Sequence, residues 1–442
     1  MKRFIYIFCC ICICSSVQSQ VKWTLRECID YAVEHNIDIK KQILKADKSK
    51  VEVSTSKNSR LPNLNASFDQ NFNFGRSTTS DNASISKNSN NLTFSIGSSL
   101  PIFTGFKISN QIKMDKLNFQ AALEGLNKAI ENIELQVTSL YLDVLFKKEI
   151  LKVFQDQAKL TAEQLDRTEV LYNSGKIPAS QVYDMKAKLA EDELNITTSK
   201  NDLDIAMLNL SQALNLQEES KFDIKDPYLN DVITENQSSI LPVNQIYRTA
   251  IAIKPHVKEA QLLHESSKKA LKIAQSGYYP TLDFNVGYRT SLYRLYNAPN
   301  PEFKDQLKDN ASQYIGFTLS IPIFNRFKVR NSVRSARIDI LTRELELDLV
   351  KQDLYKEIEK AYQSAIAARS KYSSTEKATQ AAEESFKYAI ERYDVGKSTV
   401  FEFDEAQTKL LSSKSEQIQA KYDFLFRTKI LDFYNGKPID IQ

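Results

Sequence analysis

Hydrophobic and polar residues follow two different periods along this chain. Four short segments place apolar residues at every second position, which is typical of strands with one apolar and one polar face. In LNASFDQNFNF, for example, Leu64 and Phe68 share one face, and Ser67 and Asp69 share the other. Four strands are therefore expected, at residues 62–75, 91–102, 280–296 and 312–324.

Each pair of strands is followed by a pattern of longer period and much greater extent. From Ile112 to Tyr172, apolar residues recur at two positions of a seven-residue repeat over nine heptads, which indicates a coiled-coil seam. Such a helix would extend roughly 100 Å, at about 1.5 Å per residue. Long helices are expected at residues 105–172 and 327–393, and the second has more alanine along its seam.

A glycine closes each long helical pattern. Gly175 and Gly396 suit the left-handed conformation that ends many helices. A shorter helical segment follows each glycine, so each long helix is expected to form a hairpin with the helix after it. The predicted return helices cover residues 178–214 and 399–430.

The whole strand–helix pattern occurs twice. The corner SLPIFTGFKISNQIK, which contains Pro101, recurs 221 residues later as SIPIFNRFKVRNSVR, which contains Pro322. The tips LYNSGKIPASQVYDMKAKL and RYDVGKSTVFEFDEAQTKL are separated by the same interval. We interpret the chain as a tandem duplication, with a first repeat at residues 20–240 and a second at 241–442 that begins with a helix at 243–277.

The N-terminus has the features of a secretory signal. A short basic region precedes the apolar run FIYIFCCICIC, which is too short to span a bilayer. A signal peptide is expected at residues 1–19, and a lipoprotein signal with Cys12 or Cys14 acylated is the alternative. Four of the five cysteines lie in this segment, so only Cys28 would remain and no intramolecular disulfide could form.

Composition limits the possible functions. With 10 glycines and 11 prolines among 442 residues, the chain favours long uninterrupted elements. The net charge is only +4 and no basic cluster is interleaved with aromatic residues, so nucleic acid is not an expected partner. His35, His256 and His264 have no neighbours at nucleophile or metal-ligand spacing, and no glycine-rich phosphate loop occurs. We expect neither enzymatic activity nor a cofactor or metal.

The two-faced strands favour a membrane location. Alternation alone also fits a soluble sheet packed on helices, but here each second strand runs directly into a helix longer than a globular domain can cover. The polar faces are made of small residues, as the wall of a water-filled lumen would be. Lipid cannot satisfy free strand edges, and four strands cannot close a barrel. Twelve strands from three copies would enclose a lumen.

The two corner motifs and the two tip motifs resemble those of the TolC-like outer membrane efflux proteins, the outer membrane factors. WTLRECIDYAVEHN, at residues 23–36, looks like the first helix of that family. The resemblance covers essentially all of the mature chain. It implies a mixed α and β fold: a homotrimer with a twelve-stranded outer membrane β-barrel that continues into an α-helical periplasmic tunnel. An equatorial belt would come from residues of about 215–245 and from the C-terminal tail.

The same resemblance implies a function and partners. The family forms passive outer membrane channels of tripartite efflux or type I secretion systems, which work with a periplasmic adaptor protein and an inner membrane transporter. A periplasmic coiled-coil adaptor or structural protein is the alternative. It would share the helical hairpins but lack the strand pairs.

Candidate gate residues lie beside the second tip. Glu402 and Glu405 are three residues apart on one helix face, where the resemblance implies acidic residues at a periplasmic constriction. The same spacing in the first repeat gives Gln181 and Asp184. Tyr393 matches an aromatic residue that the family uses in closing the gate. Acidic residues at a helix N-terminus also interact favourably with the helix dipole, and this simpler explanation carries equal weight.

The remaining candidate residues lie at the tips and at the strand-to-helix corners. Ser398 departs from the family, which has a basic gate residue at this position. The tip turns, Gly175 with Lys176 and Gly396 with Lys397, are expected to contact the adaptor. Pro101 and Pro322 mark the strand-to-helix corners of the two repeats.

Overall fold

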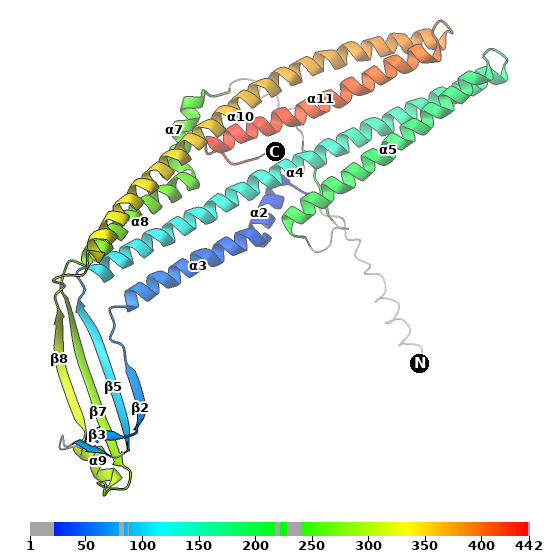
Figure 1. The fold of residues 1–442 in the computed structure, drawn as a ribbon. Coiled ribbons are helices and arrows are strands. Elements are labelled where there is room, and N and C mark those ends of the chain that lie inside the picture. The colour runs from blue at the N-terminus through cyan, green and yellow to red at the C-terminus, as the bar shows by residue number, and fades with distance from the viewer. Residues whose placement is uncertain (1–21, 79–83, 87, 217–221, 228–239, 441–442) are drawn as a thin grey trace, which may run out of the picture. The chain divides into compact units, whose positions relative to one another are not determined.

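The computed structural model describes residues 22–78, 84–86, 88–216, 222–227 and 240–440 (Figure 1). The chain forms two compact units. We call the first the helical unit, and it comprises Met1–Ile43, Gly125–Val257 and Val350–Gln442; the second, the strand unit, comprises Leu44–Glu124 and Lys258–Leu349. The expected signal peptide lies outside the described residues. Both units draw on both sequence repeats, so a repeat is not a separate folding unit.

The strand unit contains one four-stranded antiparallel sheet in the order β2-β5-β7-β8 (Figure 1). The two central strands come from different repeats, which joins the duplicated halves in one sheet. β2 and β8 form the two edges. The strands are β2 (Asn65–Asn73), β5 (Ser89–Phe103), β7 (Thr281–Leu295) and β8 (Ser312–Ser320).

The two faces of this sheet differ as the alternation predicts. Apolar side chains on the edge strands are exposed, at 65% for Phe68, 72% for Ile315 and 70% for Phe317. The opposite face carries cross-strand hydrogen bonds between small polar side chains, such as 2.8 Å between the Ser67 and Ser95 hydroxyls. An exposed apolar surface of this kind is a feature of sites that contact a membrane or another protein.

The described parts of both strand connections contain regular structure where polar loops were expected. A small hairpin of β3 (Arg76–Thr78) and β4 (Ser84–Ser86) lies between β2 and β5 in the chain. A short helix, α9 (Phe303–Asp309), lies between β7 and β8. The Thr290 hydroxyl donates to the carbonyl oxygen of Leu307 at 2.9 Å, which holds α9 against β7.

The strand-to-helix corners are built alike. In each corner the two phenylalanines of the motif pack edge to face, at 5.3 Å for Phe103 with Phe106 and at 5.6 Å for Phe324 with Phe327. Two residues with positive φ precede each helix: Gly105 (+61°) with Phe106 (+63°), and their counterparts Arg326 (+54°) with Phe327 (+61°). A side chain at Gly105 would meet the Ser276 carbonyl oxygen at 2.7 Å, so only glycine fits there.

The second corner corrects one predicted boundary. A strand was expected to continue to residue 324, but β8 ends at Ser320. Pro322 has no backbone N–H to donate to a neighbouring strand, which explains the early end. Pro101 lies within β5, where the register shifts between Pro101 and Phe103. The same motif therefore ends a strand in one repeat and marks a bulge in the other.

Two helices of equal length leave these corners, α4 (Lys107–Asn173) and α10 (Lys328–Asp394), with 67 residues each. Each begins in the strand unit and ends in the helical unit. The remaining long helices are α2 (Leu25–His35), α3 (Ile37–Asn58), α5 (Ala179–Leu214), α7 (Val243–Ile253), α8 (Pro255–Ser276) and α11 (Val400–Tyr434). Among the described residues, no helix is long and apolar enough to cross a bilayer.

The core of the helical unit anchors the start of the described chain. The side chain of Tyr141 is almost fully buried, and its hydroxyl donates to the carbonyl oxygen of Lys225 at 2.6 Å and lies 3.3 Å from that of Trp23. Trp23 is part of β1 (Lys22–Trp23), which pairs in parallel with β6 (Asp223–Ile224), and Lys225 follows β6. Part of the predicted belt segment is therefore fixed in the core, while residues 217–221 and 228–239 lie outside the described part.

Cys28 belongs to the same core. Its side chain is fully buried, and it is the only cysteine among the described residues. Burial disfavours the charged thiolate and raises the pKa of the thiol to about 12. This thiol is therefore unreactive near neutral pH, because the thiolate is the nucleophilic form.

The helix expected at residues 243–277 is in fact two helices, α7 and α8, which meet at Lys254 and Pro255. A residue before proline is driven toward extended geometry, and Lys254 has ψ 128°. Its buried ammonium lies 3.2 Å from a Glu131 carboxylate oxygen and 3.1 Å from the centre of the Phe433 ring. Burial lowers the pKa of Lys254, while Glu131 opposes that effect.

Candidate functional site

The predicted gate and adaptor-contact residues lie at the tips of two helical hairpins, α4 with α5 and α10 with α11 (Figure 1). The two turns have the same backbone. Gly175 and Gly396 have φ of +73° and +72°. The Lys176 N–H donates to the carbonyl of the fifth residue before it at 3.0 Å, and the Lys397 N–H does so at 2.8 Å. This is the Schellman arrangement. All four residues are exposed.

The helices that follow the turns begin differently. α5 follows Pro178, whose side chain makes no capping hydrogen bond. α11 follows Thr399, which forms a full capping box with Glu402. The Glu402 carboxylate accepts from the Ser398 hydroxyl at 2.6 Å and from the Thr399 N–H at 3.1 Å. These two hydrogen bonds lower the pKa of Glu402. Glu402 is therefore engaged with the start of its own helix, as the simpler explanation anticipates.

Glu405 and Asp184 are both exposed. Asp184 lies on α5 beside a groove of about 340 Å³ between α5 and α11. The Lys188 ammonium joins the two helices at this point, 3.0 Å from an Asp404 carboxylate oxygen. The groove is lined by Asp184, Met185, Lys188, Val400, Phe401, Phe403, Asp404 and Gln407. Neither Glu402 nor Glu405 is part of this lining.

Tyr393 connects the two hairpins. Its ring packs against Phe403 with centroids 5.0 Å apart, and its hydroxyl lies 3.3 Å from the Thr168 hydroxyl on α4. The next residue, Asp394, accepts from the Arg167 guanidinium at 3.2 Å with both carboxylate oxygens. The end of α10 is thus fixed to α4 through two side-chain pairs.

A buried polar cluster nearby was not predicted from the sequence. Thr161 on α4, Asp192 on α5 and Gln407 on α11 are each at most 1% exposed. The Thr161 hydroxyl donates to Asp192 at 2.6 Å and accepts from the Gln407 amide at 3.1 Å. Burial raises the pKa of Asp192, and the Thr161 hydrogen bond opposes this. The signal was available, because Thr161 and Thr168 are polar residues in a mostly apolar seam.

The described residues contain no group of three or more His, Cys, Asp or Glu side chains that could hold a metal ion. His256 is half-buried in the helical unit, and burial together with Lys128 and Lys254 lowers its pKa to about 4. The imidazole is therefore neutral over the physiological range. The chemistry of the tips is that of charge, hydrogen bonding and apolar contact.

Comparisons with known proteins agree with this architecture. A family model described as outer membrane efflux protein matches residues 28–216 and 246–432. The outer membrane protein TolC of Escherichia coli (strain K12) is 22% identical over 406 residues, which is 88% of this chain and 77% of TolC.

Two solved structures share the fold. A crystal structure of CusC superimposes with a TM-score of 0.79 and 15% identity, over 95% of this chain and 93% of CusC. The outer membrane protein VceC of Vibrio cholerae gives a TM-score of 0.76 with 14% identity, over 94% of this chain and 97% of VceC. Both tip turns, both corners and all four sheet strands lie within the residues that the family model matches. The chain belongs to the outer membrane efflux protein family.

Proposed function

We propose that this protein is a passive outer membrane channel of a tripartite efflux or type I secretion system. The sheet is the observation that carries the proposal, because it has an exposed apolar face, an opposite face that is mostly polar, and helices of 67 residues that follow its strands. An apolar band facing lipid and a polar face lining water are the requirements of a membrane-spanning sheet. Membership of the outer membrane efflux protein family supports the same assignment.

We further propose that the channel is a homotrimer. Edge strands β2 and β8 leave backbone groups that lipid cannot satisfy. Because all neighbouring strands are antiparallel, β8 of one copy would lie antiparallel to β2 of the next. Three copies then give twelve strands and a lumen lined by the polar face.

The hairpin tips are proposed to contact a periplasmic adaptor, which links the channel to an inner membrane transporter. The turns at Gly175–Lys176 and Gly396–Lys397 are exposed. Large apolar side chains around them are exposed as well, including Phe401 at 76% and Tyr183 at 70%. Such side chains are favourable contacts for another protein.

The periplasmic constriction is proposed to involve Tyr393, Asp184, Glu402 and Glu405. Tyr393 would hold the closed state through Phe403 and Thr168. Glu405 and Asp184 are exposed acids that would give the constriction a negative charge, which favours cations in a narrow aqueous path. Glu402 would add charge while it fixes the start of α11. No catalytic residue is proposed.

The protein purified in mild detergent tests the proposal. We expect a particle of three chains that forms ion-conducting channels in planar bilayers and hydrolyses no ATP. A stable monomer with intact strand content and no conductance would contradict the channel and favour the periplasmic structural alternative. ATP hydrolysis by the isolated protein would contradict the passive mechanism.

A further inference from the structure

One row of residues crosses all four strands of the sheet on its polar face. Asn65 pairs with Gly97, Gly97 with Gly287, and Gly287 with Tyr314. The row therefore has two adjacent glycines beside one large aromatic residue. The other positions of β8 on this face are small: Ser312, Gly316, Thr318 and Ser320.

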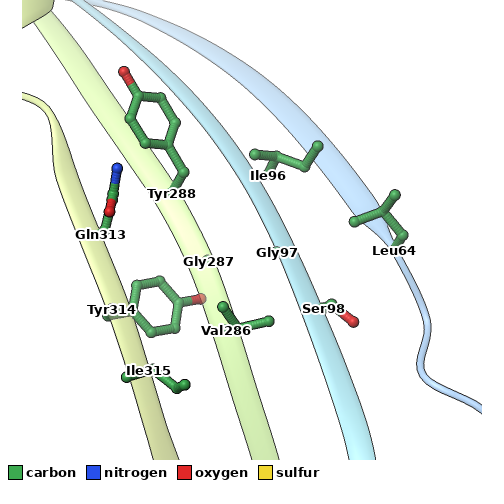
Figure 2. A pocket seen from close by; sticks show the side chains of 10 residues that line it. All are labelled: Leu64, Ile96, Gly97, Ser98, Val286, Gly287, Tyr288, Gln313, Tyr314 and Ile315. Atoms are coloured by element: carbon green, nitrogen blue, oxygen red, sulfur yellow. The ribbon is translucent and has the colours of Figure 1, made fainter.

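The tyrosine ring lies over the glycines. A Cβ atom at Gly287 would lie 2.6 Å from three atoms at the end of the Tyr314 ring, including the hydroxyl oxygen. At Gly97 the added atom would lie 3.4 Å from the same oxygen. Figure 2 shows the Tyr314 side chain reaching from β8 toward Gly287 on the neighbouring strand. The ring covers the space that two side chains would otherwise occupy.

At Gly97 and Gly287 the sheet consists of backbone alone, because neither residue has a side chain. On the opposite face, side chains of the neighbouring rows border an open groove of about 580 Å³, with the two glycines in its lining (Figure 2). Glycine weakens a strand interior and often marks a bulge, a bend or a position that another group approaches closely. Here the approaching group is the Tyr314 ring, and Tyr314 is 54% exposed overall.

We propose that Gly97 and Gly287 form a seat that holds the Tyr314 ring flat against the channel wall, so that this row helps to set the free width of the lumen. The inference rests on the proposed function, which makes the polar face the lumen wall. Side chains on strands normally stand roughly perpendicular to the sheet. A tyrosine without the seat would project toward the axis, and three copies would narrow the path together.

Gly287→Ala tests the seat, because the added methyl group must displace the ring. Gly316→Ala is the matched control: it lies on the same face, and an added Cβ there meets nothing within 4 Å. Single-channel conductance in planar bilayers is the readout. We expect a loss of conductance in Gly287→Ala, with the larger loss for bulky organic cations, and no change in Gly316→Ala. The double variant Gly287→Ala/Tyr314→Ser should recover the parent conductance.

Tyr314→Ser alone keeps the test decisive if Gly287→Ala does not assemble. A ring that already lies against the wall obstructs little, so its removal should leave conductance nearly unchanged. A marked rise in Tyr314→Ser, or a parental conductance in assembled Gly287→Ala trimers, would overturn the seat. A parent protein that forms no channels would instead overturn the proposed function.

Discussion

The two hairpins have the same backbone at their tips but different side chains along their seams. Gly175 and Gly396 make matching turns, while Thr161 and Thr168 of the first seam correspond to alanines in the second. Those alanines are Ala382 and Ala389. The turns need only a glycine and main-chain hydrogen bonds, so both copies retain them. The polar contacts between hairpins depend on particular side chains. The threonine hydroxyls that make these contacts are present in the first seam and absent from the second.

The tyrosines before the two turns show the same divergence. Tyr172 is 45% exposed. Its counterpart Tyr393 is half-buried, packs on Phe403 and reaches the Thr168 hydroxyl. Equivalent positions in a duplicated chain therefore have separate roles: the first hairpin offers the Thr161 and Thr168 hydroxyl groups, and the second supplies Gln407 and Tyr393, which contact them.

The largest effect is expected when the first hairpin is made like the second at the buried cluster. Thr161→Ala leaves Asp192 and Gln407 buried without their shared partner, which typically costs about 1–3 kcal/mol. The midpoint of thermal unfolding, followed by circular dichroism, should fall. Thr197→Ala is the control, because the Thr197 hydroxyl bonds only its own exposed helix at 3.0 Å. An equal effect in both variants would contradict the special role of the cluster.

A smaller effect is expected at the start of α11, which has a capping box that α5 lacks. Thr399→Ala should destabilise this helix start by about 1 kcal/mol. Amide hydrogen exchange should become faster in the first turn of α11 and stay unchanged in α5. Ser180→Ala, on the exposed first turn of α5, should have no comparable effect. Unchanged exchange in the Thr399 variant would mean that neighbouring contacts fix this end.

Tyr393→Phe sharpens the comparison of the two tyrosines. The variant loses only the hydroxyl contact with Thr168. The packed conformation of the tip should therefore be destabilised by about 0.5–1.5 kcal/mol. Faster exchange at the end of α10 and a higher open probability in bilayers are expected. Tyr172→Phe should behave like the parent. If both variants matched the parent, Tyr393 would have no part in closure.

The smallest expected effect is on pH dependence. The folded protein lowers the pKa of Glu402 from 4.5, so the stabilisation from its hydrogen bonds is present above pH 4.5. It is lost as the pH falls through the folded pKa. Acid should therefore loosen the start of α11 and leave α5 unaffected, as measured by exchange at both tips. In Glu402→Gln, acid should no longer affect the start of α11 more than the start of α5. A loosening of α11 by acid that persists in this variant would implicate another titrating group.

Periodicity within one segment was enough to find the strands, the long helices and the tip turns. It did not show that Thr161 pairs with Gln407, 246 residues away, because a polar seam position fits solvent exposure as well as a buried partner. The break before Pro255 had a local signal that the prediction of one helix passed over, because a proline inside a helical pattern ends or kinks the helix at the preceding residue. Positive φ at Arg326 could not be expected, since only its counterpart Gly105 is a glycine.

The candidate site also combines features that the sequence could predict with features that depend on how the chain packs. The Thr399–Glu402 capping box has a local sequence signature, a threonine with glutamate three residues later, and could have been predicted. The contacts of Tyr393 with Thr168 and Phe403 depend on how two hairpins pack, which one sequence does not specify. The assignment of Glu405 and Asp184 to a constriction depends on neighbouring copies and stays a prediction.

Because Cys28 is buried, the folded protein has no accessible thiol among its described residues that would react with labelling reagents. The raised pKa and full burial of Cys28 leave it out of reach of maleimide-type reagents in the native state. A single cysteine introduced at an exposed tip or strand edge could therefore be labelled without first replacing Cys28. Four further cysteines lie within residues 9–14. If that segment is removed on export, dye uptake by the unmodified chain would distinguish precursor from mature protein without an antibody.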